Sequence, residues 1–382
     1  MLKGGIPAEL DSLRRLTQLD LGFNNLTGDI PPFFGNLPLL AILDLPQNSL
    51  TGVIPPSLGC LSNLVHLDMY NSNLSGVRNN LQGGIPSSLG KLSSLTYLEC
   101  SEDNLSGEIP ASLGQLSSLT YLDLGLNELS GSILSSLYNL SAIIDFAFNV
   151  NQLSGTLPSH IGNALPNLQN FYVSQNHVTG PIPASLANAS ALQDIELSAN
   201  NFKGTIPSNL GKLQSLNWLD VSDNQLEAKD ITDWSFMMAL TNRTNSQFLY
   251  VEYNMLGGRM PSSIANLSTR LEALALNNHQ ISGVIPDGIW KLIHLNLLDM
   301  GTNLLQGSLL PEIGKLWRLQ RLSLGENMLS GEIPFTLGNL IKMNTLYLQQ
   351  NDLEGSNPSV FGNFENLELL DLSYNKLTGA IP

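Results

Sequence analysis

The chain of 382 residues is poor in charged side chains, and basic residues are its scarcest charged class. Charged residues make up 13% of the sequence, with 17 Lys and Arg against 32 Asp and Glu, for a formal net charge of -15. A surface that binds phosphates needs clustered basic residues, and the sequence has none. The composition therefore weighs against nucleic acid and against an anionic membrane surface as partners.

Long apolar runs are also missing. No stretch of 18 apolar residues occurs, so we expect no direct membrane insertion by this chain, and no signal peptide is recognisable. The first residues, from Met1 to Pro7, and the last, from Leu377 to Pro382, resemble the interior of a repeat rather than a polar terminal cap. We therefore expect the chain to be a segment of a longer protein, with both caps missing.

The dominant feature is a repeated frame, LxxLxLxxNxLxGxIPxxLGxL, whose asparagine returns most often every 24 residues. One copy contains Leu16, Leu19, Leu21, Asn24 and Pro31. A period in this range predicts a solenoid whose units bury their apolar faces against one another. We therefore predict one α/β solenoid domain over residues 1–382, of about fifteen repeats and wound as a right-handed superhelix.

Each part of the frame has a physical role. The LxL stretch alternates apolar and polar residues, which predicts a parallel sheet on the concave side. The segment after the IP pair is too short for a regular helix and predicts a 3₁₀ or single helical turn on the convex side. The asparagine amide can pair with backbone groups of its own and adjacent turns, which predicts a structural ladder. Its members are Asn24, Asn48, Asn127, Asn151, Asn176, Asn200, Asn224, Asn254, Asn303, Asn327, Asn351 and Asn375.

Some repeats depart from the frame. Ser72, Asp103 and His279 occupy the asparagine position, and we expect local distortion at Asp103 and His279. Two insertions lie near residues 73–83 and 226–247. The second predicts a longer convex helix with Thr232 as its N-cap and Asp233 in its first turn.

The two cysteines are expected to remain unpaired. Cys100 occupies a buried strand position, whereas Cys60 lies in the turn segment more than one repeat away, so a disulfide between them is not expected. We expect both to be buried thiols.

The LxGxIP extension resembles the plant-specific class of leucine-rich repeats, and it covers essentially the whole chain. Two segments, from Leu226 to Asn242 and from Ser262 to Gly283, are similar to signatures of a subfamily of leucine-rich-repeat receptor kinases. That subfamily includes plant immune receptors for bacterial protein fragments. The resemblance implies an extracellular sensing domain in defence signalling, on the outer side of the plasma membrane. It also implies a membrane helix and a Ser/Thr kinase that this chain does not contain, and a possible co-receptor kinase ectodomain as partner.

No enzyme motif is recognisable, and we expect neither catalysis nor a cofactor. The five histidines share no metal-ligand spacing, so no metal site is predicted. The acidic column Asp20, Asp44, Asp68, Glu99 and Asp123 admits a carboxylate-pair interpretation, but we interpret it as ordinary filling of the LxL position.

Binding is the predicted function, because aromatic side chains are enriched at interface hot spots. The acidity favours a peptide or protein ligand with exposed Lys or Arg. The candidate ligand-binding residues on the concave face are Tyr97, Glu99, Tyr121, Asp123, Tyr172, Glu196, Trp218, Asp220 and Tyr250.

Seven Asn-x-Ser/Thr tripeptides are candidate glycosylation sites, of which the convex-turn positions Asn139, Asn188 and Asn266 are the better ones. The full set is Asn25, Asn73, Asn104, Asn139, Asn188, Asn242 and Asn266.

Two alternatives remain open at this stage. A secreted inhibitor of cell-wall-degrading enzymes would use the same repeat without a kinase. A truncated product without a function of its own would expose uncapped apolar ends.

Overall fold

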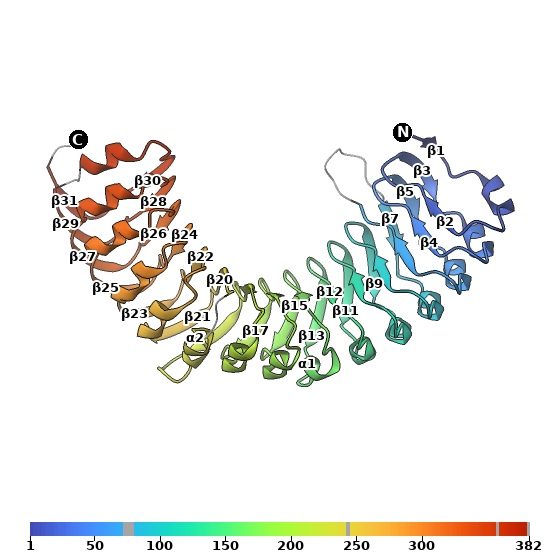
Figure 1. Cartoon of the computed structure of the whole chain (residues 1–382), viewed down its shortest axis with the longest axis horizontal. Helices are drawn as coiled ribbons and strands as arrows, with labels where there is room; N and C mark the ends of the chain where they lie inside the picture. The colour runs from blue at the N-terminus through green and yellow to red at the C-terminus, as the bar shows by residue number, and fades with distance from the viewer. Residues whose placement is uncertain (72–79, 242–244, 357–358, 380–382) are drawn as a thin grey trace. The chain divides into compact units, whose positions relative to one another are not determined.

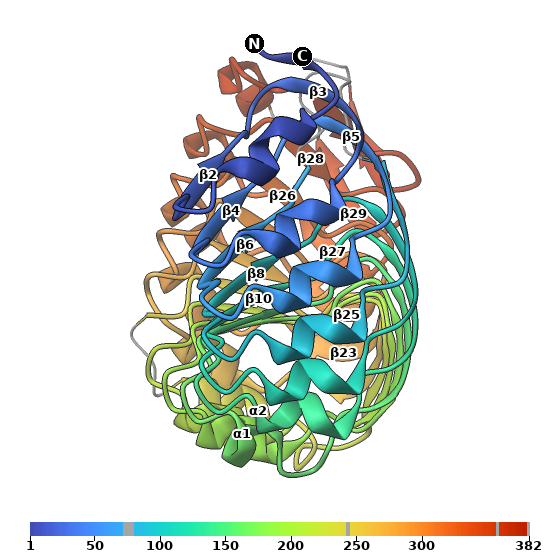
Figure 2. The same cartoon turned by 90° about the vertical axis from the view of Figure 1, so that its right-hand side faces the viewer.

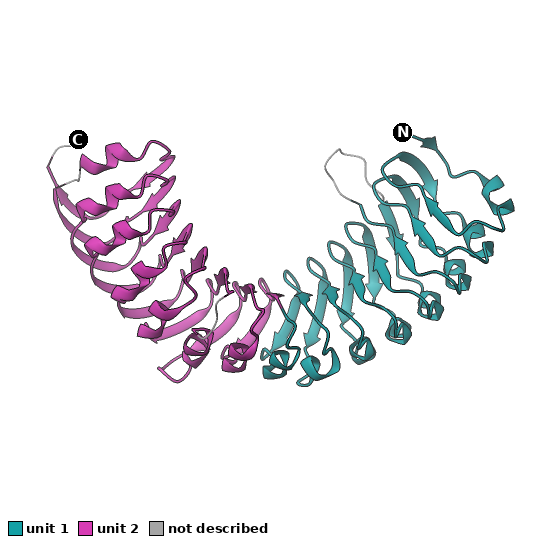
Figure 3. Cartoon of the chain, viewed as in Figure 1, with its two compact units in different colours: residues 1–192 teal, residues 193–382 magenta. Residues whose placement is uncertain are grey.

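The computed structural model describes residues 1–71, 80–241, 245–356 and 359–379 (Figure 1). It divides into two compact units, Met1–Leu192 and Gln193–Pro382, which we call unit 1 and unit 2 (Figure 3). Each unit has an inner parallel sheet on its concave side and short helical turns on its convex side (Figure 3). This is the architecture of a leucine-rich-repeat solenoid, as the sequence predicts.

The inner sheet of each unit is built from the LxL stretches. Its middle side chains point into the core, where Leu43, Leu98 and Leu122 are fully buried, so the flanking side chains face outward. In unit 1 the strands follow the order β2 (Gln18–Asp20), β4 (Ile42–Asp44), β6 (His66–Asp68), β8 (Tyr97–Glu99), β10 (Tyr121–Asp123), β12 (Asp145–Ala147) and β14 (Asn170–Tyr172). In unit 2 they are β16 (Asp194–Glu196), β18 (Trp218–Asp220), β20 (Phe248–Tyr250), β22 (Ala273–Ala275), β24 (Leu297–Asp299), β26 (Arg321–Ser323), β28 (Thr345–Tyr347) and β30 (Leu369–Asp371).

A second parallel sheet follows the asparagine positions, and the sequence analysis did not predict it. In unit 1 it contains β1 (Lys3–Gly4), β3 (Asn25–Asp29), β5 (Ser49–Gly52), β7 (Asn80–Gly83), β9 (Asn104–Glu108), β11 (Glu128–Ser132), β13 (Gln152–Thr156) and β15 (His177–Gly180). In unit 2 it contains β17 (Asn201–Gly204), β19 (Gln225–Ala228), β21 (Met255–Arg259), β23 (Gln280–Val284), β25 (Leu304–Ser308), β27 (Met328–Glu332), β29 (Asp352–Ser356) and β31 (Lys376–Thr378). The glycine of the LxG segment sits in these strands at positive φ, for example +82° at Gly107.

The convex turns are mostly 3₁₀ segments of five residues, which the spacing of the repeat predicts. In Figure 2 the turns of unit 1, blue to green, follow one another in a column. In unit 1 they are η1 (Ala8–Ser12), η2 (Pro32–Asn36), η3 (Pro56–Cys60), η4 (Ser87–Lys91), η5 (Ala111–Gln115), η6 (Ser135–Asn139), α1 (Ile161–Ala164) and η7 (Ala184–Asn188). In unit 2 they are η8 (Ser208–Lys212), α2 (Ser235–Leu240), η9 (Ser262–Asn266), η10 (Asp287–Lys291), η11 (Pro311–Lys315), η12 (Phe335–Asn339) and η13 (Ser359–Asn363).

The asparagine side chains tie neighbouring repeats together. The Nδ2 group of Asn151 donates to the carbonyl oxygens of Leu124 and Phe148 at 2.9 and 3.1 Å, and its Oδ1 accepts the Leu129 N–H at 2.9 Å. The same pattern recurs in unit 2, where Asn303 donates to Leu276 at 2.8 Å. Each amide therefore satisfies backbone groups that the turn would otherwise leave buried and unpaired.

The residue before each ladder asparagine lies in the left-handed region of φ, whatever its type. Val150 has φ 55°, Leu126 has 52° and Thr302 has 51°. Branched side chains disfavour this conformation by roughly 1–2 kcal/mol. The hydrogen bonds of the ladder hold the turn in place against that cost.

Two ladder substitutions leave the backbone intact, so the distortion expected at Asp103 and His279 is not observed. Glu102 and Asn278, which precede them, have φ 59° and 58°, like their counterparts in other repeats. The following strands β9 and β23 pair in the usual parallel way. The consequence is chemical instead, because Asp103 Oδ2 and His279 Nε2 are buried without a hydrogen-bond partner among the described residues.

The second insertion contains the expected helix, but its start differs from the prediction. The helix α2 begins at Ser235, and Thr232 makes no N-cap hydrogen bond to it. Asp230 instead accepts the backbone N–H groups of Thr232 and Asp233 at 2.8 and 3.3 Å, so an Asp turn precedes the helix. Most of the first insertion, residues 73–79, lies outside the described residues, and so does Ser72.

The prediction for the cysteines was half wrong. Cys100 is fully buried, as expected, whereas Cys60 is exposed at the end of η3. Cys60 directly follows the buried Gly59 at the end of the turn. The equivalent positions in the next two turns, Lys91 and Gln115, are exposed as well.

Candidate functional site

The outward face of the inner sheet in unit 1 carries a row of carboxylates. Register pairs place Asp44 beside Asp68, Asp68 beside Glu99 and Glu99 beside Asp123, with Asp20 beside Asp44 at the edge. Neighbouring parallel strands lie about 4.8 Å apart, so these acids adjoin one another. Four of the five have a structural duty as well, since one oxygen accepts a backbone N–H two residues later, for example Gly125 on Asp123 at 2.7 Å. Asp44 does not, because the residue two positions later is Pro46, which has no N–H.

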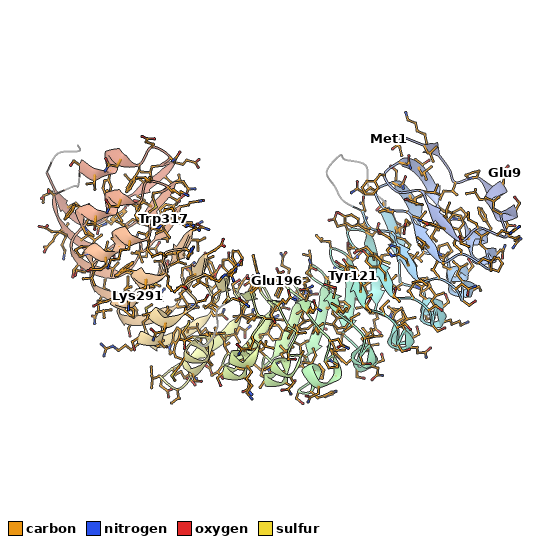
Figure 4. All side chains as sticks on the ribbon, in the orientation of Figure 1. Met1, Glu9, Tyr121, Glu196, Lys291 and Trp317 are labelled. Atoms are coloured by element: carbon orange, nitrogen blue, oxygen red, sulfur yellow. The ribbon has the colours of Figure 1, made fainter. Side chains whose placement is uncertain are left out.

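An aromatic stack runs beside this row on the same face. The rings of His66 and Tyr97 are stacked at 4.2 Å with an interplanar angle of 10°, and those of Tyr97 and Tyr121 at 4.3 Å and 9°. Figure 4 shows Tyr121 on the inner side of unit 1. Its hydroxyl donates to Glu99 Oε2 at 2.8 Å, and His66 Nε2 lies 3.1 Å from Asp44 Oδ1. The rings and acids therefore form one connected surface.

A cavity of about 470 Å³ opens over this surface. It is lined by aromatic, acidic and small polar side chains, and no Lys or Arg is among them. The lining residues are Phe23, Pro46, Asp68, Tyr70, Tyr97, Glu99, Ser101, Glu102, Tyr121, Asp123, Leu126 and Asn149. A site of this composition favours a ligand that is cationic and partly apolar.

Burial and mutual repulsion raise the pKa values of these acids. Burial is the main cause that raises the pKa of Asp68 to about 6. The hydrogen bond from the Tyr70 N–H lowers this pKa, and repulsion from Asp44 raises it further. Burial, then Glu99, raises the pKa of Asp123 to about 7. Burial also raises the pKa of Glu99, although hydrogen bonds from Ser101 and Tyr121 oppose the rise. A cation in the cavity would relieve this repulsion.

Unit 2 has a separate aromatic cluster on its own inner sheet. The ring of Trp218 lies 4.7 Å from that of Phe248 and 5.3 Å from that of Tyr250. Asp220, beside Tyr250 in the register, accepts the Ser222 N–H at 2.9 Å. Burial, then Asp220, raises the pKa of Glu196, which Figure 4 shows on the inner side of this unit.

The structure brings some of the predicted ligand residues together and leaves others apart. Tyr97, Glu99, Tyr121 and Asp123 line the cavity of unit 1. Trp218 and Tyr250 join in the unit 2 cluster with Asp220 alongside. Tyr172 on β14 is not part of the cavity lining, and Glu196 lies on β16.

His66 and Asp68 are among the members of the unit 1 site that were missed from the sequence. His66 stacks on Tyr97, and Asp68 lines the cavity, yet neither was among the predicted ligand residues. Their repeat precedes the insertion near residues 73–83, so they lie 31 residues from Tyr97 and Glu99 rather than 24. The acidic column of the sequence analysis already aligns Asp68 with Glu99, and the same alignment puts His66 in the column of Tyr97.

The glycosylation candidates differ in access. Asn139, Asn188 and Asn266 are exposed at the ends of convex turns, where the sequence places them. Asn104 is exposed and donates to Asn80, whereas Asn25 is only half-exposed. Asn73 and Asn242 lie outside the described residues.

Metal and membrane features can be assessed only over the described ranges. Within them, no group of three or more His, Cys, Asp or Glu side chains could hold a metal ion. Every helix in those ranges is too short or too polar to cross a bilayer.

Comparison with protein families places the chain. The family model named Leucine-rich repeat region matches residues 6–277, and the model named Leucine Rich Repeat matches residues 318–340 and 366–382. The chain belongs to the leucine-rich-repeat family.

Its curated relatives are plant receptor kinases. A stretch of 138 residues is 57% identical to a putative receptor-like protein kinase of Arabidopsis thaliana, covering 36% of this chain and 14% of that protein. A stretch of 89 residues is 43% identical to the LRR receptor-like serine/threonine-protein kinase EFR of the same plant, and it covers 23% of this chain and 9% of that protein. The receptor kinase-like protein Xa21 of Oryza sativa subsp. japonica is 42% identical over 87 residues, covering 23% and 8%. The matched stretches thus span only a small part of these relatives.

The solved structures that resemble this chain include plant receptors as well. A TDR receptor has a TM-score of 0.89 and 32% identity, covering 100% of this chain and 63% of that chain. The plant peptide hormone receptor RGFR1, in complex with RGF2, has a TM-score of 0.84 and 33% identity, and the match covers 98% of this chain and 62% of that chain. The Arabidopsis receptor kinase HAESA, in complex with the peptide hormone IDA and the co-receptor SERK1, has a TM-score of 0.72 and 31% identity. This match covers 100% of this chain and 69% of that chain. The predicted fold and the resemblance to ectodomains of plant leucine-rich-repeat receptor kinases are confirmed.

Proposed function

We propose that this chain is the ligand-binding part of an extracellular leucine-rich-repeat segment of a plant receptor-like kinase, and that its ligand is a peptide or protein. The observation that carries this proposal is the stack of His66, Tyr97 and Tyr121 beside a row of carboxylates in unit 1. A cavity of about 470 Å³ opens over this surface. Stacked rings offer a large contact area that is already ordered, so a ligand meets it at little entropic cost.

The comparisons support a binding role. RGFR1 and HAESA are described in complex with peptide hormones, and HAESA also with a co-receptor. By analogy, a peptide would be the ligand of this chain, and a co-receptor kinase ectodomain would join the complex. The aromatic and acidic side chains of this chain favour the inner faces of its sheets as the binding surface. Catalysis has no part in this proposal, because a kinase domain would lie elsewhere in a longer protein.

The proposal includes a place for the chain in the cell and in the receptor. It treats residues 1–382 as one solenoid within that receptor, on the outer side of the plasma membrane, in the defence signalling that the sequence resemblance implies. Exposed Asn139, Asn188 and Asn266 would then carry glycans.

Panning a display library of linear peptides on the immobilised full chain tests the proposal. Peptides that bind should lose at least about tenfold in affinity on Tyr97→Ala and Tyr121→Ala, because truncation of a hot-spot residue typically costs about 2 kcal/mol or more, and about 1.4 kcal/mol already corresponds to tenfold. Trp218→Ala tests the unit 2 cluster in the same way. The control is Phe335→Ala, which removes an aromatic ring that is 74% exposed on the convex turn η12.

Circular dichroism of each variant shows whether the fold survives. If no peptide is enriched, or if enriched peptides bind the Tyr97 and Tyr121 variants as well as they bind the control, this surface is not the ligand site.

A further inference from the structure

Unit 2 contains an arginine, Arg321, that contacts a carboxylate and a tyrosine ring on the inner sheet. The cavity of unit 1 has carboxylates and tyrosine rings in its lining but no arginine. Arg321 projects from the first outward position of β26, and its Nη2 lies 3.4 Å from Oδ2 of Asp299, at the last position of β24. Its guanidinium carbon lies 6.0 Å from the ring centre of Tyr347, at the last position of β28. A carboxylate on one side and a tyrosine ring on the other thus hold one guanidinium group.

Unit 1 presents these two partners without the arginine. Asp68, Glu99 and Asp123 occupy the last positions of β6, β8 and β10, which correspond to the position of Asp299 in β24. Tyr97 and Tyr121 occupy the first positions of β8 and β10, which correspond to the position of Arg321 rather than to that of Tyr347, and all five side chains line one cavity. Among the described residues, His66 is the one basic side chain paired with a carboxylate of this acidic row, with its Nε2 3.1 Å from Asp44 Oδ1.

We propose that the cavity of unit 1 binds the guanidinium group of an arginine side chain, supplied by the peptide of the proposed function, on which this inference rests. Two neighbouring carboxylates from Asp68, Glu99 and Asp123 accept its N–H groups. The aliphatic part of the arginine packs against the rings of Tyr97 and Tyr121.

Arginine fits this site better than the other cations. Its planar group carries five N–H donors in a fork that matches carboxylate oxygens, and it is less strongly hydrated than an ammonium group. A divalent ion such as Ca²⁺ needs six to eight oxygen ligands. Here one oxygen of Asp68 and one of Asp123 are already occupied by the N–H groups of Tyr70 and Gly125, at 2.9 and 2.7 Å. The described residues also contain no cluster suited to a metal.

The test uses three blocked pentapeptides with Arg, citrulline or Lys at the centre, titrated against the full chain by calorimetry or by NMR. Citrulline keeps the shape of arginine but not its charge. We expect saturable binding of the arginine peptide, with the citrulline peptide at least tenfold weaker and the lysine peptide in between. Absence of saturation at about 10 mM, where even a binding free energy near −3 kcal/mol would be detected, overturns the proposal, as does equal binding of arginine and citrulline.

Variants locate the site. The Asp68→Asn and Asp123→Asn double variant removes two charges while keeping side-chain oxygens for the turns, and it should weaken the arginine peptide at least tenfold. The control is Asp371→Asn, since Asp371 holds the same position in β30 and accepts the Ser373 N–H at 2.9 Å, but lies outside this cavity. An equal loss in the control variant contradicts the assignment.

The two proposals can fail separately. If library peptides bind through Tyr97 and Tyr121 without any preference for arginine, the inference fails and the proposed function stands. If the arginine pentapeptide binds through Asp68 and Asp123 but panning yields no binder that depends on Tyr97 and Tyr121, the pocket recognises guanidinium and the peptide-receptor proposal fails.

Discussion

The side-chain amide of Asn127 donates a hydrogen bond of 2.8 Å to the carbonyl oxygen of Cys100, 27 residues earlier in the chain. Its oxygen accepts the backbone N–H of Leu105 at 3.0 Å, and its amide also reaches Leu124 O at 3.1 Å. One side chain, 9% exposed, thus joins two repeats through the backbone. Because a solenoid is held mainly by contacts between neighbouring repeats, such a bond contributes to the coupling of the whole unit.

Replacement of Asn127 by Ala should therefore lower the free energy of unfolding by about 2–4 kcal/mol, because several buried backbone groups lose their partners. Urea denaturation followed by circular dichroism measures the loss. Hydrogen exchange should rise first around residues 100–129. The exposed Asn139, replaced by Ala, is the control, and an equal shift in both variants would show that the ladder bonds contribute little.

Asp103 is the weak member of this ladder in unit 1. Its Oδ1 accepts the Leu81 N–H at 3.3 Å, while Oδ2 is buried and has no hydrogen-bond partner in the part of the chain that the structure describes. Burial raises the pKa of Asp103 from 3.8 to about 8, although the Leu81 bond opposes the rise. An asparagine there would supply amide donors for the carbonyls of Cys100 and Ser101, as Asn127 does for Leu124 and Gly125.

Asp103→Asn should stabilise the protein by about 1–3 kcal/mol at pH 7. Between pH 4 and 8 the folded state holds a proton on Asp103 that the unfolded state has released, so stability of the wild type falls as pH rises through this window. The variant should show a shallower fall and a smaller advantage at pH 4. Urea midpoints across pH 4–9 measure both effects. A pH slope equal to that of the wild type would mean that Asp103 is charged in the fold.

Binding of the arginine pentapeptide should strengthen from pH 5 to pH 8. Folded-state pKa values of about 6 for Asp68 and about 7 for Asp123 mean that the acids lose their protons, and so gain charge, over this range. The other titratable groups on or beside this surface include Asp20, Asp44, His66, Tyr70, Tyr97, Glu99, Glu102, Tyr121 and Asp145.

Calorimetric titration at several pH values measures this dependence. His66 is a basic side chain that stacks on Tyr97 and lies 3.1 Å from Asp44, next to the acids that this prediction concerns. His66→Gln is therefore the control that isolates the carboxylates. If that variant binds arginine equally at pH 5 and pH 8, the acids do not set the affinity.

The sequence predicted the fold well because the repeat frame ties each residue to one physical role. Leu98 and Leu122 are buried, and Tyr97 and Tyr121 stack, since a fixed period puts equal positions side by side. The second sheet was missed because the LxG strands carry glycines, which weaken strand propensity. The positive φ of Val150 was also missed, because neighbouring repeats impose it and the local sequence does not favour it.

The glycine in the convex turns offers a matched test of how tightly neighbouring turns pack. A Cβ atom added to Gly114 in η5 would lie 2.2 Å from the backbone oxygen of Ser136 in η6, whereas one added to Gly362 in η13 would meet nothing within 4 Å. Both glycines occupy the same position of the frame, and neither has positive φ. Gly114→Ala should therefore cost about 1–3 kcal/mol or more from overpacking, while Gly362→Ala should change stability by less than about 0.5 kcal/mol. Urea denaturation of the two variants gives the difference directly. Equal midpoints would show that η5 and η6 can move apart at little cost.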